Sequence, residues 1–172
     1  EQYLIRPTPI RLFAIVEAMR RGMTVKKAHS LTGIDEWFLQ AVRRVVECEQ
    51  EAEKIPLHTY TKEQMKALKR IGVSDRRIAT LTNTRELEVR KYRKMLGVTP
   101  CVFQIDTLAG EFPAKTNYLY MTYNGSHNDV EPLGRRGVAL LGSGPYRIGS
   151  SVEFDWTCVQ TALALKEYNR RS

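Results

Sequence analysis

The chain repeats itself at an offset of fifty residues, and this duplication constrains its fold more than any other feature. Six residues of the first copy recur in the second without a gap: Arg20, Gly22, Leu31, Thr32, Glu36 and Arg43 match Arg70, Gly72, Leu81, Thr82, Glu86 and Arg93. One such unit cannot bury its apolar face alone, so neighbouring copies pack together. Two copies predict a duplicated helical bundle and not an open array.

Helix start and stop signals divide each copy into short helices. The first copy has three start signals, at Thr8-Pro9, Thr24 and Asp35. Threonine and aspartate are preferred there because their side-chain oxygens accept hydrogen bonds from unpaired backbone N–H groups. Ser74 repeats the signal of Thr24, and Gly97 ends the last helix. We therefore predict two three-helix units, residues 9–47 and 60–97.

Apolar residues at helical spacing predict which side of each helix faces the core. The first helix carries the stripe Leu12, Ile15, Val16 and Met19, and the third carries Phe38, Ala41, Val42 and Val45. In the second copy, the inner stripe consists of Val89, Tyr92 and Leu96. We expect the two units to pack together through these stripes.

The periodicity changes after Pro100. Residues 102–105 and 118–123 are rich in β-branched or aromatic side chains and predict two short strands. A stretch rich in turn-forming residues follows them. We therefore predict a helical domain with exit strands at 1–124, a linker at 125–137 and a second domain at 138–172.

The second domain opens with a loop rich in glycine. Residues 138–141 are an apolar run suited to a buried parallel strand, and helical spacing begins at Val152. Backbone N–H groups in such a loop can bind an anion, and the candidate residues are Gly142, Ser143, Gly144 and Gly149. However, Gly149 comes two positions late for the dinucleotide-binding fingerprint, and Pro145 removes one donor. A phosphate cradle and a plain strand-to-helix turn both stay open.

A single strand, loop and helix cannot form a complete domain. A parallel strand needs a crossover connection and partner strands to cover both of its faces, and the sequence after the last helix offers none. We therefore expect a piece of a larger protein and exclude a self-contained dinucleotide enzyme. The predicted fold is mainly α, with duplicated three-helix units followed by short strands and the truncated start of an α/β domain.

The net charge of +8 lies entirely in the helical half. Residues 1–97 hold 20 Lys and Arg against 12 Asp and Glu, whereas residues 98–172 hold seven of each kind. A basic tandem helix-turn-helix that binds nucleic acid is therefore the alternative function. The candidate recognition helices begin with Asp35, Glu36 and Trp37 and with Arg85 and Glu86. Acidic side chains at that position repel DNA phosphates, so we expect no nucleic-acid partner.

Composition argues against several other classes of protein. Cys48, Cys101 and Cys158 are odd in number and far apart, which disfavours a disulfide framework. No metal-ligand spacing links the cysteines to the three histidines. No apolar stretch approaches the ~20 residues of a membrane span. We expect no catalytic residue, no metal site, no bound cofactor and no membrane contact in this chain.

Three stretches of the sequence resemble the middle of the large subunit of carbamoyl phosphate synthetase. They are Leu12–Leu39, Gln104–Asn124 and Leu140–Trp156, and with the repeat between them the resemblance covers nearly the whole chain. It implies that residues 1 to 124 form the oligomerisation domain between two synthetic halves. Residues 138–172 would then begin the second half, ahead of its ATP-grasp fold.

The resemblance also implies the chemistry of the parent enzyme. Such enzymes join bicarbonate, glutamine-derived ammonia and two ATP molecules into carbamoyl phosphate, with Mg²⁺ or Mn²⁺ on the nucleotide phosphates and K⁺ in support. Implied partners are further copies of the chain, the other domains of the large subunit and a glutaminase subunit or domain. The implied location is the cytoplasm, or the mitochondrion in some relatives. The segment itself is expected to be inactive, because the ATP-grasp cores hold the reacting groups.

One motif could contribute to the reaction even so. In the family, the glutamate that follows the arginine-isoleucine-glycine motif lies along the internal passage that carries carbamate to the second site. Here that pattern places Arg147 before Glu153. The resemblance therefore implies Glu153 and Arg147 as carbamate-passage candidates. A protected path is useful because carbamate hydrolyses readily in water.

Overall fold

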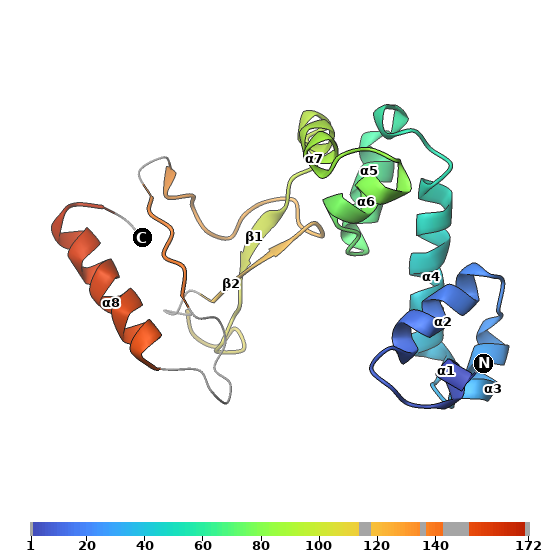
Figure 1. Ribbon diagram of the computed structural model, residues 1–172. Helices are drawn as coiled ribbons and strands as arrows, with labels where there is room; N and C mark the ends of the chain where they lie inside the picture. Colours follow the sequence, from blue (N-terminus) through green and yellow to red (C-terminus); the bar gives the residue numbers. More distant parts are fainter. Residues whose placement is uncertain (1, 114–117, 135–136, 143–151, 171–172) are drawn as a thin grey trace. The chain divides into compact units, whose positions relative to one another are not determined.

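The computed structural model describes residues 2–113, 118–134, 137–142 and 152–170 (Figure 1). They belong to two compact units, Glu1–His127 and Asn128–Ser172, and each unit is described by itself. Most of the regular structure is helical, and two short strands form a two-stranded sheet. The prediction of a mainly α fold is confirmed. The domain bounds 1–124, 125–137 and 138–172 stay predictions.

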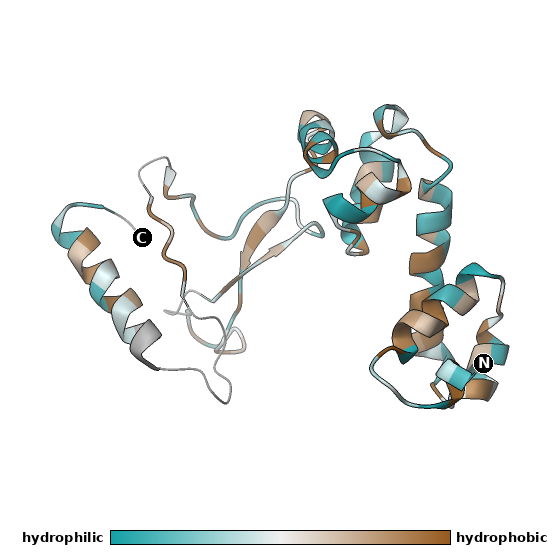
Figure 2. Ribbon diagram, viewed as in Figure 1, coloured by the Kyte–Doolittle hydropathy of each residue, from teal (hydrophilic) through white to brown (hydrophobic). Residues whose placement is uncertain are grey.

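The first repeat consists of four helices with their own core. They are α1 (Gln2–Ile5), α2 (Arg11–Arg20), α3 (Val25–Thr32) and α4 (Glu36–Ala52). The core residues are Leu4, Ile15, Met19, Ala28, Leu39 and Val46. Figure 2 shows hydrophobic residues on α2 and on the part of α4 beside it. Arg11 fastens the short α1 in place, because its guanidinium donates to the Leu4 and Thr32 carbonyl oxygens at 2.7 and 2.6 Å.

The second repeat has the same order of helices and a separate core. It contains a 3₁₀ turn (Leu57–Thr59), α5 (Lys62–Arg70), α6 (Asp75–Leu81) and α7 (Glu86–Met95). The most deeply buried of its core residues are Leu57, Met65, Ile78 and Val89. A capping box between Thr61 and Gln64 starts α5.

The two repeats share their turn geometry as well as their sequence. Gly22 and Gly72 both have φ +93°, a backbone conformation that favours glycine. The Thr24 hydroxyl accepts from the Lys27 N–H, and the Ser74 hydroxyl accepts from the Arg77 N–H. The predicted caps at Thr24 and Ser74 are therefore confirmed, as is the cap at Asp35.

Some details of the first repeat differ from the prediction. Helix α2 begins at Arg11 and not beside Pro9, and the Thr8 carbonyl oxygen accepts from the Arg11 N–H. Leu12 and Phe38, predicted to face the core, are 55% and 59% exposed. The buried stripe of α4 instead runs through Leu39 and Val46. Periodicity favours Phe38 as a core residue because adjacent apolar residues in this helix fit more than one apolar stripe.

Helix α4 belongs to both repeats. Its first turns pack on α2 and α3, and its last residue, Ala52, lies in the core of the second repeat. The buried Tyr60 hydroxyl donates to the Ala52 carbonyl oxygen at 2.7 Å. The second repeat is thereby attached to the end of this helix.

Both predicted exit strands are present, and they form an antiparallel pair. Strand β1 (Cys101–Gln104) pairs with β2 (Leu119–Thr122), with Cys101 opposite Thr122 and Gln104 opposite Leu119. Phe103 and Tyr120 lie opposite each other and form an edge-to-face ring contact with centroids 5.7 Å apart. Tyr123, just after β2, packs on the core of the second repeat.

The described part of the second unit contains helix α8 (Val152–Glu167), as predicted. The predicted strand at 138–141 is wrong as a strand, because Val138, Ala139, Leu140 and Leu141 form no ladder. Leu141 is 94% exposed. The described residues supply no neighbour for such a strand, and an unpaired strand leaves its backbone groups without partners. In the described part of the chain, every helix is too short or too polar to cross a bilayer.

Candidate functional sites

The predicted anion loop and carbamate-passage residues are only partly described. Gly142 is described, and a side chain built on it would contact the Cys158 sulfur at 3.7 Å. Glu153 belongs to the first turn of α8. Ser143, Gly144, Arg147 and Gly149 lie outside the described residues. The anion loop and the carbamate passage therefore stay predictions.

A set of large apolar side chains is exposed on the first repeat. They come from α1, from the start of α2 and from the first turn of α4, each more than half exposed: Tyr3, Ile5, Ile10, Leu12, Phe13, Trp37 and Phe38. We call these seven residues the apolar surface. Single exposed apolar residues are ordinary, but a concentration of this kind is typical of interaction sites.

The two aromatic rings at the start of α4 stand out within the apolar surface. Trp37 and Phe38 make an edge-to-face contact with ring centroids 4.9 Å apart. The Asp35 carboxylate accepts from the Trp37 backbone N–H at 2.8 Å, which fixes the start of the helix that carries both rings. Aromatic side chains are large and have few rotatable bonds, so they lose little conformational freedom on binding and suit a protein interface.

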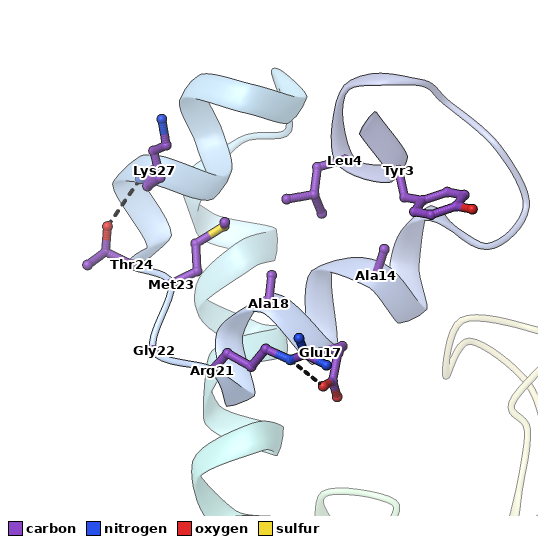
Figure 3. Close-up of a pocket in the computed structure, with 10 residues that line it drawn as sticks. All are labelled: Tyr3, Leu4, Ala14, Glu17, Ala18, Arg21, Gly22, Met23, Thr24 and Lys27. Atoms are coloured by element: carbon purple, nitrogen blue, oxygen red, sulfur yellow. Dashed lines mark hydrogen bonds and ion pairs between the residues drawn. The ribbon is translucent and has the colours of Figure 1, made fainter. Parts of the chain in front are cut away.

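A pocket of about 950 Å³ opens beside this surface, between α1, α2 and α3 (Figure 3). Its apolar lining includes Leu4, Ala18 and Met23. Its polar rim includes an ion pair between the Arg21 guanidinium and the Glu17 carboxylate at 2.7 Å. Both partners of that pair are more than half exposed, so it defines the rim and adds little stability. The pocket offers room for an apolar side chain with a polar or charged end.

A carboxylate ties the two repeats together. Glu49, on α4, accepts two hydrogen bonds from the Arg77 guanidinium on α6, both at 2.7 Å. It also pairs with Arg20 at the end of α2. The hydrogen bonds from Arg77 lower the pKa of the Glu49 carboxyl more than burial raises it. Glu49 is therefore charged at neutral pH and bridges helices of both repeats.

A second buried carboxylate lies inside the second repeat. The Asp75 carboxylate accepts from the Lys69 ammonium at 2.9 Å and from the Arg93 guanidinium at 2.8 Å. All three side chains are nearly buried. Burial raises the pKa of Asp75, but the hydrogen bonds from Lys69 and Arg93 outweigh burial and lower it. The sequence analysis missed both this cluster and the one at Glu49.

These two clusters are structural and do not resemble a catalytic centre. Every carboxylate oxygen in them faces an arginine or a lysine, which leaves no proton acceptor for a substrate. Among the described residues, no three His, Cys, Asp or Glu side chains gather as metal ligands. We assign no described residue to catalysis.

Comparison with known families gives two matches along the chain. A family model for the oligomerisation domain of the carbamoyl-phosphate synthetase large chain matches residues 1–97. A second one, for the carbamoyl phosphate synthase preATP-grasp domain, matches residues 134–172. The first match covers the two repeats, and the second covers the glycine loop and α8.

Curated relatives agree with these matches. A carbamoyl phosphate synthase large chain from Nostoc is 47% identical over 93% of this chain. An arginine-specific mitochondrial large chain from Schizosaccharomyces pombe is 48% identical over 94%. The multifunctional protein pyr1-3 of Dictyostelium discoideum is 42% identical over 100%. The chain spans 14%, 14% and 8% of the length of these relatives, respectively. Their names give no support to the nucleic-acid alternative.

Proposed function

The chain belongs to the family of the carbamoyl-phosphate synthetase large chain, and we propose that its helical unit holds copies of that chain together. The observation that supports this proposal is the apolar surface on the first repeat. Phe13 and Trp37 are 71% and 69% exposed, although both side chains have large apolar areas that favour burial. A second copy of the chain would cover them.

The second repeat offers much less apolar surface, which favours the first repeat as the site of contact. On α7 the exposed large apolar residues are Leu87 and Met95, which lie eight positions apart. Charged residues fill much of the sequence between them. A charged face is costly to desolvate on association.

Replacing Phe13 by Ser tests the proposal. We expect self-association of the 172-residue chain to weaken by about 2 kcal/mol or more, roughly 30-fold, as at other central aromatic contacts. Sedimentation velocity over a concentration series measures the effect. Leu87→Ser is the matched control, since Leu87 is also 71% exposed but lies on the second repeat. A wild-type chain that stays monomeric at tens of micromolar would contradict the proposal.

The proposal extends to the protein that contains this chain. It would make carbamoyl phosphate from bicarbonate, glutamine-derived ammonia and two ATP, with Mg²⁺ or Mn²⁺ and K⁺, for pyrimidine or arginine synthesis. A glutaminase subunit or domain would supply the ammonia. The cytoplasm is the proposed location, and the mitochondrion is the alternative because a relative carries that word in its name. No described residue is assigned to ATP or metal, so we expect the 172-residue chain alone to be inactive.

Glu153 and Arg147 remain the proposed carbamate-passage residues. Glu153→Gln, made in the complete enzyme, removes the charge but keeps the shape of the side chain. We expect bicarbonate-dependent ATP hydrolysis to persist while carbamoyl phosphate synthesis falls about tenfold, because carbamate lost to water no longer reaches the second site. Measuring both rates on one preparation separates loss of passage from loss of folding. Equal rates of synthesis in variant and wild type would remove Glu153 from the passage.

A further inference from the structure

We propose that a small cavity between α5 and the exit strands binds a small oxyanion, such as phosphate or a carboxylate. The cavity has a volume of about 230 Å³ and lies wholly within the first unit. Its lining comes from α5, from the turn after α7 and from the exit strands with the turn that follows them: Lys62, Lys66, Gly97, Val98, Thr99, Cys101, Tyr123, Gly125 and Ser126. The oligomerisation proposal does not use these residues.

The charges around the cavity favour an anion. Lys62 and Lys66 lie one helical turn apart on α5, and no carboxylate lines the cavity with them. Within the described residues, neither ammonium group belongs to an ion pair. Like charges four residues apart on a helix repel each other. An oxyanion between them would replace that repulsion with two attractive contacts.

Polar groups that can donate hydrogen bonds complete the lining. Thr99 and Ser126 contribute hydroxyl groups, and the Ser126 oxygen lies 3.2 Å from the His127 ring nitrogen Nδ1. Tyr123 adds a phenol, and burial raises its pKa, so the phenol keeps its proton at neutral pH. Ammonium and hydroxyl donors around a small space are the groups that bind an oxyanion.

Two glycines, Gly97 and Gly125, line the cavity. The Lys62 ammonium nitrogen lies 3.7 Å from the position that a Cβ on Gly97 would occupy. Gly97 also has φ +71°, so a side chain there would be strained. At Gly125 a Cβ would lie 2.5 Å from the Phe103 ring, so only glycine lets the turn approach this closely. Substitution would therefore strain the backbone at Gly97 and displace the turn at Gly125 from Phe103.

The size of the cavity limits the ligand. Pockets that hold drug-sized molecules range from roughly 300 to 1,000 Å³, and this one is smaller, at about 230 Å³. A nucleotide is therefore excluded. Inorganic phosphate, or a small carboxylate, matches both the volume and the two positive charges.

The test uses the complete 172-residue chain at constant ionic strength. Sodium phosphate and sodium acetate are each titrated against sodium chloride, while the midpoint of thermal unfolding and the heat of binding are recorded. We expect one of the two oxyanions to raise the midpoint saturably. The double variant Lys62→Gln/Lys66→Gln should weaken that binding at least tenfold. The control Lys91→Gln/Lys94→Gln removes two charges from exposed positions on α7 and should leave binding unchanged.

Each result of the titration has one meaning. Saturable stabilisation by phosphate alone assigns a phosphate site, and stabilisation by acetate alone assigns a carboxylate site. Stabilisation by neither, or an equal effect of chloride, overturns the proposal. Equal binding by the wild type and the Lys62/Lys66 double variant also overturns it. Ser126→Ala keeps both lysines and is expected to weaken binding severalfold, so the proposal stays testable if the double variant unfolds.

Discussion

The two repeats follow one helical plan but place different chemistry at the same positions. In the first repeat, Met19 and Val25 occupy the end of one helix and the start of the next. Fifty residues later, Lys69 and Asp75 take these places and form a nearly buried ion pair. The backbone around both pairs is alike, since Gly22 and Gly72 share φ +93°. The helical plan therefore tolerates an apolar pair or an ionic one.

Each repeat has an arginine at the same position, and these two arginines show what the buried ion pair adds. Arg43 donates to the Met19 carbonyl oxygen at 3.1 Å and pairs with Glu47. Its counterpart Arg93 donates to the Val98 carbonyl oxygen and binds Asp75. Arg43 thus satisfies a carbonyl in the last turn of α2, whereas Arg93 satisfies one beyond the end of α7. Only Arg93, in the second repeat, also joins a buried network of ion pairs.

The difference follows from where the chain goes next. The first repeat continues into α4, and the last residue of α4 already lies in the core of the second repeat. The second repeat ends at Gly97, and the chain must be held where it turns into the exit strands. The Lys69 ammonium and the Arg93 guanidinium lie 5.1 and 5.7 Å from the centre of the Tyr123 ring. Hydrogen bonding and cation–π contact thus hold Val98 and Tyr123 at this exit.

The largest effect is expected from Asp75→Val. It leaves two buried cations without their carboxylate, which costs about 3–5 kcal/mol of unfolding free energy. The double variant Lys69→Met/Asp75→Val copies the Met19 and Val25 pair of the first repeat and should recover about half of that loss, because an apolar pair replaces the ion pair at little cost while Arg93 alone stays without a carboxylate. Urea denaturation measures both. If the double variant is as unstable as the single one, the repeats are not interchangeable at these positions.

Glu49→Gln should have the next largest effect, because it weakens the link between the repeats. Loss of charged hydrogen bonds to Arg77 and Arg20 is expected to lower the unfolding free energy by about 2 kcal/mol. Glu53→Gln is the matched control, since Glu53 binds Arg20 alone and is 43% exposed. Chemical denaturation should show a much smaller loss for the control.

The same variant also tests the pH dependence. The folded-state pKa values of Glu49 and Asp75 are both lowered, so their stabilisation is full above the ordinary carboxyl pKa of about 4. It is lost as the pH falls below that value. Glu49→Gln should therefore make the acid side of the stability profile less steep. A profile as steep as that of the wild type would show that Glu49 titrates alike in the folded and unfolded chains.

The smallest effects are expected where the repeats are most alike. Thr24→Ala and Ser74→Ala each remove one N-cap hydrogen bond and should each cost about 1 kcal/mol. Thermal unfolding of the two variants and of the wild type measures both losses of stability. Losses that differ by more than about twofold would mean that the equivalent turns carry unequal strain, against the matching backbone angles.

The sequence predicted the plan of the helices but not the ionic clusters. Local signals set the plan: Gly22 readily takes the backbone conformation that ends a helix, and Thr24 can cap one without help from the rest of the chain. The pairing of Glu49 with Arg77 joins residues 28 positions apart. The acidic residues around Glu49 are typical of an exposed helix end. Only the packed fold brings the Glu49 side chain against α6.

Exposure of apolar residues was equally hard to predict. Periodicity placed Leu12 and Phe38 inside, yet they belong to the apolar surface. An apolar residue that faces a partner has the same sequence pattern as one that faces the core. The anion loop is a different case: its glycines are a local signal, but Ser143, Gly144 and Gly149 lie outside the described residues, so that prediction remains to be tested.

Helix α4 fixes the spacing between the repeats. One residue inserted between Val46 and Ala52 would turn everything beyond it by about 100° and advance it by about 1.5 Å. Ala52 would then leave the second core, and Glu49 would no longer lie opposite Arg77. Insertions and deletions should therefore be absent from this stretch among functional relatives, whereas the connector between α4 and α5 can vary in length. The length of α4 is thus a constraint on how the chain can evolve, because this one helix sets how the second core meets the first.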